Sequence, residues 1–220
     1  MASHFEPAGK QDEKRIFGWK RVIDITLPLH EGMDKPSPVF EGFRLHWDLR
    51  IEKGQGRNRS RFSMESHLGT HVDAPVHFIK DGKFIDQVPV ENLFGPAGVI
   101  QVPFPGAVTA EFLEKVRPGP EIFLFKFGKE RLDRKRPYFS PDGVKALIGR
   151  GVRVVGTDNF NVDSIQTEWE IHHLILGNGI LIVEGLNLEG IADGAYDFIC
   201  LPLLIKGGEG APARALLLEK

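Results

Sequence analysis

Residues 67–78 read HLGTHVDAPVHF, and this stretch sets the first expectations for the fold and its site. It holds several of the chain's 8 histidines and one aspartate: His67, His71, Asp73 and His77. In an extended backbone, residues two apart share a face, so His71 and Asp73 project together, and His67 joins them if the chain between stays extended. Imidazole and carboxylate suit Zn²⁺ or Mn²⁺, and the lack of thiolate argues against a structural zinc finger. The stretch therefore predicts a metal site.

The spacing of the histidines alone would be weak, because histidines four residues apart also occur in solvated loops. The interleaved Asp73, Gly69 and Pro75 favour the metal site over that alternative. Pro75 fixes its own φ and restricts Ala74, so the chain beyond the ligands is stiff. His77 is therefore expected to lie near the metal without necessarily binding it.

Two later segments offer further ligands. In ILIVEGL (180–186), Glu184 lies in a strand that is apolar on both faces, and a buried carboxylate there needs a positive partner. A metal or a basic side chain would serve, and a wet strand end near Gly185 is the other alternative. In IHHLIL (171–176), His172 and His173 diverge by about 100° on a helix, so only one can face a given point. Periodicity does not choose between them.

Composition argues against several classes of function. Lys plus Arg number 28 against 30 Asp plus Glu, so the net charge of −2 gives no electrostatic case for binding nucleic acid or an anionic membrane. The only cysteine, Cys200, sits in FICLPLLI (198–205) and is expected to be a buried core thiol. The N-terminus lacks the apolar region of a signal peptide, and no apolar run reaches the length of a membrane span. We expect a cytoplasmic protein with a small-molecule partner.

Alternating apolar patterns predict many strands and few helices. Residues 1–15, polar and charged, predict a flexible N-terminal arm, and residues 16–220 predict a single domain. Strands are expected at 21–27, 43–51, 61–66, 97–104, 121–127, 152–157, 180–186, 198–205 and 215–219. Helices are expected after Thr109, between the Ser140 N-cap and Gly151, and over 165–176. The order predicts a mixed α/β domain rather than a doubly wound nucleotide-binding sheet.

The opening stretch matches every position of H-x-G-T-H-x-D-x-P-x-H, the signature of the metal-dependent cyclase-like hydrolase family. That family includes bacterial kynurenine formamidases and isatin hydrolases. The chain resembles it along most of its length, because four further segments look like family blocks in family order: VIDITLPLHEGM (22–33), GTDNFNVDSI (156–165), HHLILGNGILIVEGLNLEGI (172–191) and LPLLIKGGEGAPARALLL (201–218).

The resemblance implies roles for individual residues. It places metal ligands at His67, His71 and Asp73, and a catalytic role at His77. In formamidases with two metals, a later histidine and a glutamate twelve residues beyond it complete the site, and this spacing selects His172 and Glu184. The resemblance also implies a swivelling β/β/α fold and a homo-oligomer, either a dimer or a tetramer. The chain departs from formamidases at MDKPSPVFEGF (33–43), where an aromatic-Pro-Gly-Asp segment is common, and at Asn161, where serine is common.

These residues predict a metal-dependent amidohydrolase that acts on non-peptide C–N bonds. One or two Zn²⁺ ions, or Mn²⁺ as the alternative, would lower the pKa of a bound water and supply hydroxide. His77 would act as general acid/base on an N-formyl or cyclic amide, with N-formylkynurenine as the leading substrate by family prevalence. Three alternatives stay open: a ring-opening hydrolase of the isatin or lactone type, a polyketide-type cyclase, and a non-catalytic metal-binding protein.

Overall fold

The computed structural model describes residues 18–117, 119–128, 136–164 and 167–220. Three α-helices lie in this part of the chain: α1 (Ala110–Glu114), α2 (Pro141–Gly149) and α3 (Glu170–Gly177). The strands are β1 (Arg21–Asp24), β2 (Arg44–Leu49), β3 (Arg59–Ser63), β4 (His71–Asp73), β5 (Phe94–Gln101), β6 (Ala107–Val108), β7 (Ile122–Lys126), β8 (Tyr138–Phe139), β9 (Val154–Thr157), β10 (Leu181–Glu184), β11 (Gly194–Pro202) and β12 (Gly210–Glu219). Short 3₁₀ turns also occur: Ile51–Lys53, Pro75–His77, Ile85–Gln87 and Val90–Leu93.

The main sheet has 8 strands in the order β1-β12-β11-β5-β7-β9-β10-β4, and β12 also pairs with β4. This second pairing closes seven strands of the main sheet, all except β1, into a barrel-like ring. The pairs β5–β7, β7–β9 and β9–β10 are parallel, whereas β11 and β12 pair antiparallel with their neighbours. The predicted mixed, strand-rich α/β fold with few helices is therefore confirmed. None of the helices in the described ranges has the length and hydropathy needed to cross a membrane.

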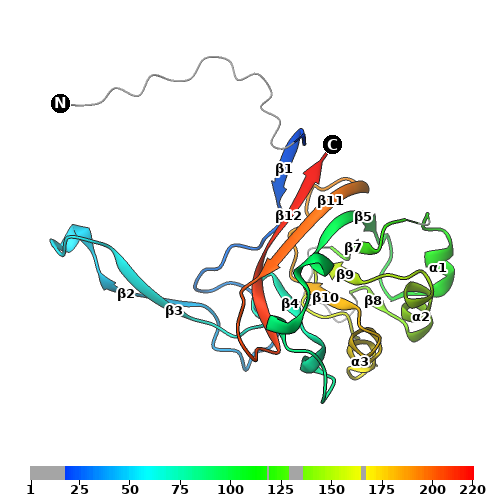
Figure 1. The fold of residues 1–220 in the computed structure, drawn as a ribbon, viewed down its shortest axis with the longest axis horizontal. Helices are drawn as coiled ribbons and strands as arrows, with labels where there is room; N and C mark the ends of the chain where they lie inside the picture. The colour runs from blue at the N-terminus through cyan, green and yellow to red at the C-terminus, as the bar shows by residue number, and fades with distance from the viewer. Residues whose placement is uncertain (1–17, 118, 129–135, 165–166) are drawn as a thin grey trace.

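The strands carry apolar side chains on both faces, and each face builds its own core. On β7, Ile122 and Leu124 join a cluster inside the ring, while Phe123 and Phe125 join a second cluster that includes residues of all three helices. This alternation follows from the two-residue period of a strand. Figure 1 shows the helices gathered on one side of the ring, beside β7, β9 and β10. Cys200 is buried in the inner cluster, as expected, and burial raises the pKa of its thiol.

Most predicted elements are present, and the differences have local causes. Each predicted strand range overlaps an observed strand, while β4, β6 and β8 were not among the predicted strands, because two or three residues carry no periodic signal. Ser140 caps α2 by accepting the N–H of Gly143, as predicted. The third predicted helix is too long at its start: α3 begins at Glu170, because Trp169 has a left-handed φ of 73° that the helix cannot include. Residues 165–166 of that prediction lie outside the described residues.

The predicted arm at residues 1–15 lies outside the described residues, and a single domain over 16–220 stays a prediction. The β2–β3 hairpin is a feature that the alternation alone did not anticipate. Its two strands pair only with each other, and the hairpin projects away from the ring (Figure 1). All of β3 is exposed, as is most of β2.

Gly185, directly after β10, has a φ of +65°, and a Cβ there would lie 2.2 Å from the backbone oxygen of Gly69. Gly179 has a similar φ of +75° but no atom within 4 Å of its ideal Cβ. We expect Gly179→Ala to lower the free energy of unfolding by about 1–2 kcal/mol through φ strain alone, and Gly185→Ala to lower it by roughly twice that or more. Chemical denaturation measures both, and equal losses would contradict the proposed close approach.

Candidate metal centre

Strand register brings the first three polar side chains of the cluster onto one face. His71 and Asp73 are two residues apart on β4, and Glu184 on β10 is paired directly opposite His71. The Nε2 atom of His71 lies 3.3 Å from Oδ1 of Asp73 and 3.7 Å from Oε2 of Glu184. All three side chains are buried on the side of the sheet that the helices cover. The prediction that Glu184 is a buried carboxylate is confirmed, with 3% of the residue exposed.

Helix α3 adds His172 from above this face. Its Nε2 lies 3.6 Å from Oδ2 of Asp73 and 3.6 Å from Oε1 of Glu184. The other ring nitrogen, Nδ1, is 2.5 Å from Oδ2 of Asp163, which fixes the ring with Nε2 toward the carboxylates. The neighbouring His173 is exposed. The structure thus separates the two histidines that helical periodicity left equivalent, and it brings His172 into the cluster.

His67 reaches the cluster by a different route from the one expected. The chain turns between His67 and His71, with Gly69 at a φ of +70°, so the assumption of an extended backbone was wrong there. The turn nevertheless places Nδ1 of His67 2.8 Å from Oδ1 of Asp73. The expectation that residues two apart share a strand face therefore holds for His71 and Asp73, whereas His67 owes its position to a turn at Gly69.

The side chains form two groups that share Asp73. One is His67, His71 and Asp73, and the other is Asp73, His172 and Glu184; in each, the possible ligand atoms lie within 4.8 Å of one another. Neutral imidazoles and carboxylate oxygens are the donors that Zn²⁺ and Mn²⁺ accept. The cluster therefore fits a metal ion, and the shared aspartate offers one oxygen to each group.

The electrostatics of the cluster also call for a cation. Burial by itself lowers the pKa of His172, but hydrogen bonds with Asp163 and Glu184 outweigh it and raise that pKa to about 10. Burial raises the pKa of Asp73, but hydrogen bonds from His67 and His71 hold it well below its usual range. The negative charge of the buried carboxylates favours the protonated form of His172. The same negative charge would attract a divalent cation.

His77 lies beside the cluster without entering either group. The 3₁₀ turn Pro75–His77 sets its ring against His67, with the ring centroids 3.9 Å apart. Burial, above all, lowers the pKa of His77 to about 4, and the neighbouring His67 and His172 contribute. The imidazole is therefore neutral at pH 7 and free to accept a proton. The geometry agrees with the expected position of His77, near the ligands and apart from them.

The sequence did not single out Asp163 or the aromatic wall next to His172. Asp163 accepts the backbone N–H groups of Ile171 and His172 as well as the imidazole, so it orients both the start of α3 and its histidine. The Phe78 ring lies 4.6 Å from that of His172, and Trp169 lies 5.6 Å from Phe78. Asp163 lies in a loop, where no hydrophobic periodicity applies. Its position in the segment GTDNFNVDSI, which resembles a family block, was the only sequence feature that could have indicated a role.

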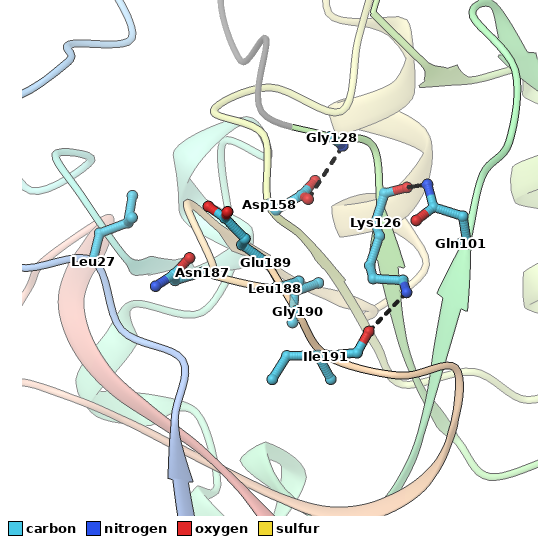
Figure 2. A pocket seen from close by; sticks show the side chains of 10 residues that line it. All are labelled: Leu27, Gln101, Lys126, Gly128, Asp158, Asn187, Leu188, Glu189, Gly190 and Ile191. Carbon is cyan, nitrogen blue, oxygen red and sulfur yellow. Dashed lines mark hydrogen bonds between the residues drawn. The ribbon is translucent and has the colours of Figure 1, made fainter.

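A separate cavity of about 250 Å³ opens where β5, β7 and β9 end, and Figure 2 shows the side chains that line it. Lys126 donates from Nζ to the carbonyl oxygen of Ile191 at 2.8 Å and pairs with Asp193 at 2.5 Å. Asp158 accepts the N–H of Gly128 at 3.2 Å. Within the part of the chain that the structure describes, none of the lining side chains belongs to either ligand group.

Residues 23–164 match the Cyclase family model, which carries the description "Putative cyclase". The chain belongs to this cyclase family. It is 32% identical over 202 residues to a kynurenine formamidase of Bacillus cereus, covering 89% of this chain and 96% of that protein. A kynurenine formamidase of Salinibacter ruber is 37% identical over 181 residues, covering 78% and 85%. The solved structure of isatin hydrolase A from Labrenzia aggregata, bound to benzyl benzoate, superposes with a TM-score of 0.77 at 26% identity, covering 90% and 93%.

Because Asp73 belongs to both ligand groups of this cyclase-family centre and Glu184 to only one, their variants separate the two groups. We expect Asp73→Asn to be purified without bound metal. We expect Glu184→Gln to retain the metal bound by His67, His71 and Asp73. Elemental analysis measures the content, with circular dichroism to establish that each variant is folded. Full metal content in Asp73→Asn would contradict the shared role of this aspartate.

Proposed function

We propose that the protein is a metal-dependent amidohydrolase that cleaves the C–N bond of an N-formyl or cyclic amide, with N-formylkynurenine as the leading substrate. The observation that carries this proposal is a buried His/Asp/Glu cluster with an imidazole outside both ligand groups, neutral at pH 7, stacked against it. A purely structural site has no use for such a base. The similarity to two kynurenine formamidases, at 32% and 37% identity, supports the choice of substrate.

In this proposal, His67, His71, Asp73, His172 and Glu184 hold one or two Zn²⁺ ions, with Mn²⁺ as the alternative. A divalent ion held by these residues would supply Lewis acidity to activate a water molecule and to polarise a carbonyl group. Two carboxylates facing two dications would leave net positive charge for the developing oxyanion. Asp163 keeps Nε2 of His172 directed at the carboxylates through its hydrogen bond to Nδ1.

His77 moves the proton. Its ring is neutral at pH 7, so it accepts a proton from the attacking water and then returns it to the leaving amine. The side chain does not need to reorient between the two steps, because its stacking on His67 and its edge contact with Phe78 hold it in place. Because burial holds the pKa of His77 below its ordinary value, the ring stays in the proton-accepting form down to acidic pH.

The aromatic surface next to His172 favours an aryl substrate. Trp169 is 52% exposed, and its ring lies 5.6 Å from Phe78 and 5.7 Å from His172, measured between ring centroids, so the aromatic surface is continuous with the cluster. A ring of the substrate stacked there would place its amide beside His77 and the ligands. N-formylkynurenine has such a ring, and so does isatin, which keeps a cyclic amide as the second candidate in line with the isatin hydrolase neighbour.

His77→Ala tests the catalytic assignment. We expect it to lower kcat for formate release from N-formylkynurenine by roughly 10²–10⁴-fold, because the proton acceptor is lost, while metal content stays at the level of the unaltered protein. His173→Ala is the matched control, since this exposed helix histidine contributes to neither ligand group. Full turnover by His77→Ala with metal bound would refute the role of His77. Ring opening of isatin without formate release from the formamide would favour the cyclic-amide alternative.

We also propose that the protein is a homo-oligomer, either a dimer or a tetramer, in which the β2–β3 hairpin packs against a second copy. A two-stranded hairpin has little stability of its own in water. One face of this hairpin is apolar, with Leu45 paired to Phe62 and Trp47 two residues further on, and all three are exposed. The run Leu201, Leu203 and Leu204 offers a second exposed apolar surface on the body.

Adjacent hairpin residues on opposite faces provide the test of this assembly. Phe62→Ser removes an apolar side chain that is 58% exposed, while Arg61→Ser removes a polar one from the other face. We expect light scattering to report a shift of Phe62→Ser toward the mass of one chain and no shift for Arg61→Ser. A monomeric unaltered protein would contradict the proposed assembly.

A further inference from the structure

His67 differs from the other two histidines of the cluster in how its ring is held. His71 donates from Nδ1 to the carbonyl oxygen of Gly69 at 2.9 Å, and His172 donates from Nδ1 to Asp163, so both turn Nε2 toward the carboxylates. His67 instead faces Asp73 with Nδ1. Its Nε2 is buried and has no hydrogen-bond partner among the described residues. A ligating imidazole normally donates its other N–H to an acceptor, so His67 needs one on its Nε2 side.

Glu209 is the acceptor within reach. Its Oε1 lies 3.5 Å from Nε2 of His67, on the side of the ring away from Asp73. The Ser66 hydroxyl donates to the same oxygen at 2.5 Å, and the Glu209 backbone oxygen accepts the N–H of Ala74 at 3.0 Å. The Glu209 carboxylate is thus anchored by the residue before His67, and the Glu209 backbone by the residue after Asp73.

The backbone next to Glu209 is also shaped for the imidazole. A Cβ on Gly210 would lie 2.7 Å from Cε1 of His67, so only glycine lets the ring lie this close to the strand. On its other side, the same ring is stacked on His77 at 3.9 Å. A contact that holds the His67 ring in place therefore also holds His77, the proposed proton acceptor, in place.

We propose that Glu209 is a positioning residue of the metal centre: its carboxylate accepts the N–H of His67 at Nε2 and so directs Nδ1 at the metal beside Asp73. His67 then binds through Nδ1, whereas His71 and His172 bind through Nε2. Each of the three imidazoles has its own acceptor: Glu209, the Gly69 carbonyl and Asp163. The inference rests on the proposed metal centre, and it does not depend on which amide is the substrate.

The test measures Zn²⁺ affinity by competition with a chromogenic chelator, beside the melting temperature of the metal-free protein. We expect Glu209→Ala to weaken Zn²⁺ binding by roughly 10–100-fold without lowering that melting temperature. Glu209→Gln should recover most of the affinity, because its amide oxygen accepts the same hydrogen bond. Glu219→Ala, at the far end of β12, which begins directly after Glu209, is the matched control and should bind like the unaltered protein.

Two results would overturn the assignment. One is Glu209→Ala binding Zn²⁺ as tightly as the unaltered protein. The other is Glu209→Gln losing as much affinity as Glu209→Ala, because an acceptor role survives this change. If the unaltered protein itself binds no Zn²⁺ and no Mn²⁺, the proposed metal centre fails together with this inference. If all variants bind Zn²⁺ as tightly as the unaltered protein, the role of Glu209 is refuted and the proposed metal centre still stands.

Discussion

The structure depends on one electrostatic constraint, the burial of Asp73 and Glu184 against each other on adjacent strands. Neither residue is more than 3% exposed, and two like charges in such a place are costly unless positive charge lies between them. Three imidazoles, from β4, α3 and the turn before β4, surround the pair. The donor set, its burial and its arrangement in two groups around Asp73 all have the same explanation, which is a divalent cation.

The strand that carries the ligands is also the strand that closes the ring. β4 has only three residues, yet it pairs with β10 on one side and with β12 on the other. Its outer residues, His71 and Asp73, face the helices and the cluster, while Val72 faces the inner core. The strand pairings that close the ring therefore also position the site residues of β4, and glycine at 185 and 210 allows the close backbone approaches beside them.

The parts of the site that follow strand periodicity were predictable from the sequence. Alternation placed His71 with Asp73, and it identified Glu184 as a carboxylate in an otherwise apolar strand. His172 could be separated from His173 only by family spacing, because two adjacent helical residues look alike to any periodic pattern. Strand alternation does not place His67, since a turn at Gly69 brings it in, so the family signature alone indicated this residue. Asp163 and Glu209 act from loops and strand ends, where tertiary contacts alone give a side chain its place.

Anomalous diffraction tests most directly whether these side chains meet around a cation. Crystals grown with Zn²⁺ and measured on both sides of the zinc absorption edge should show a strong anomalous peak among Asp73, His172 and Glu184. A second peak beside His67 would indicate that both groups are filled. Ordered side chains in the arrangement described, with no peak among them at saturating Zn²⁺ or at the Mn²⁺ edge, would contradict the account.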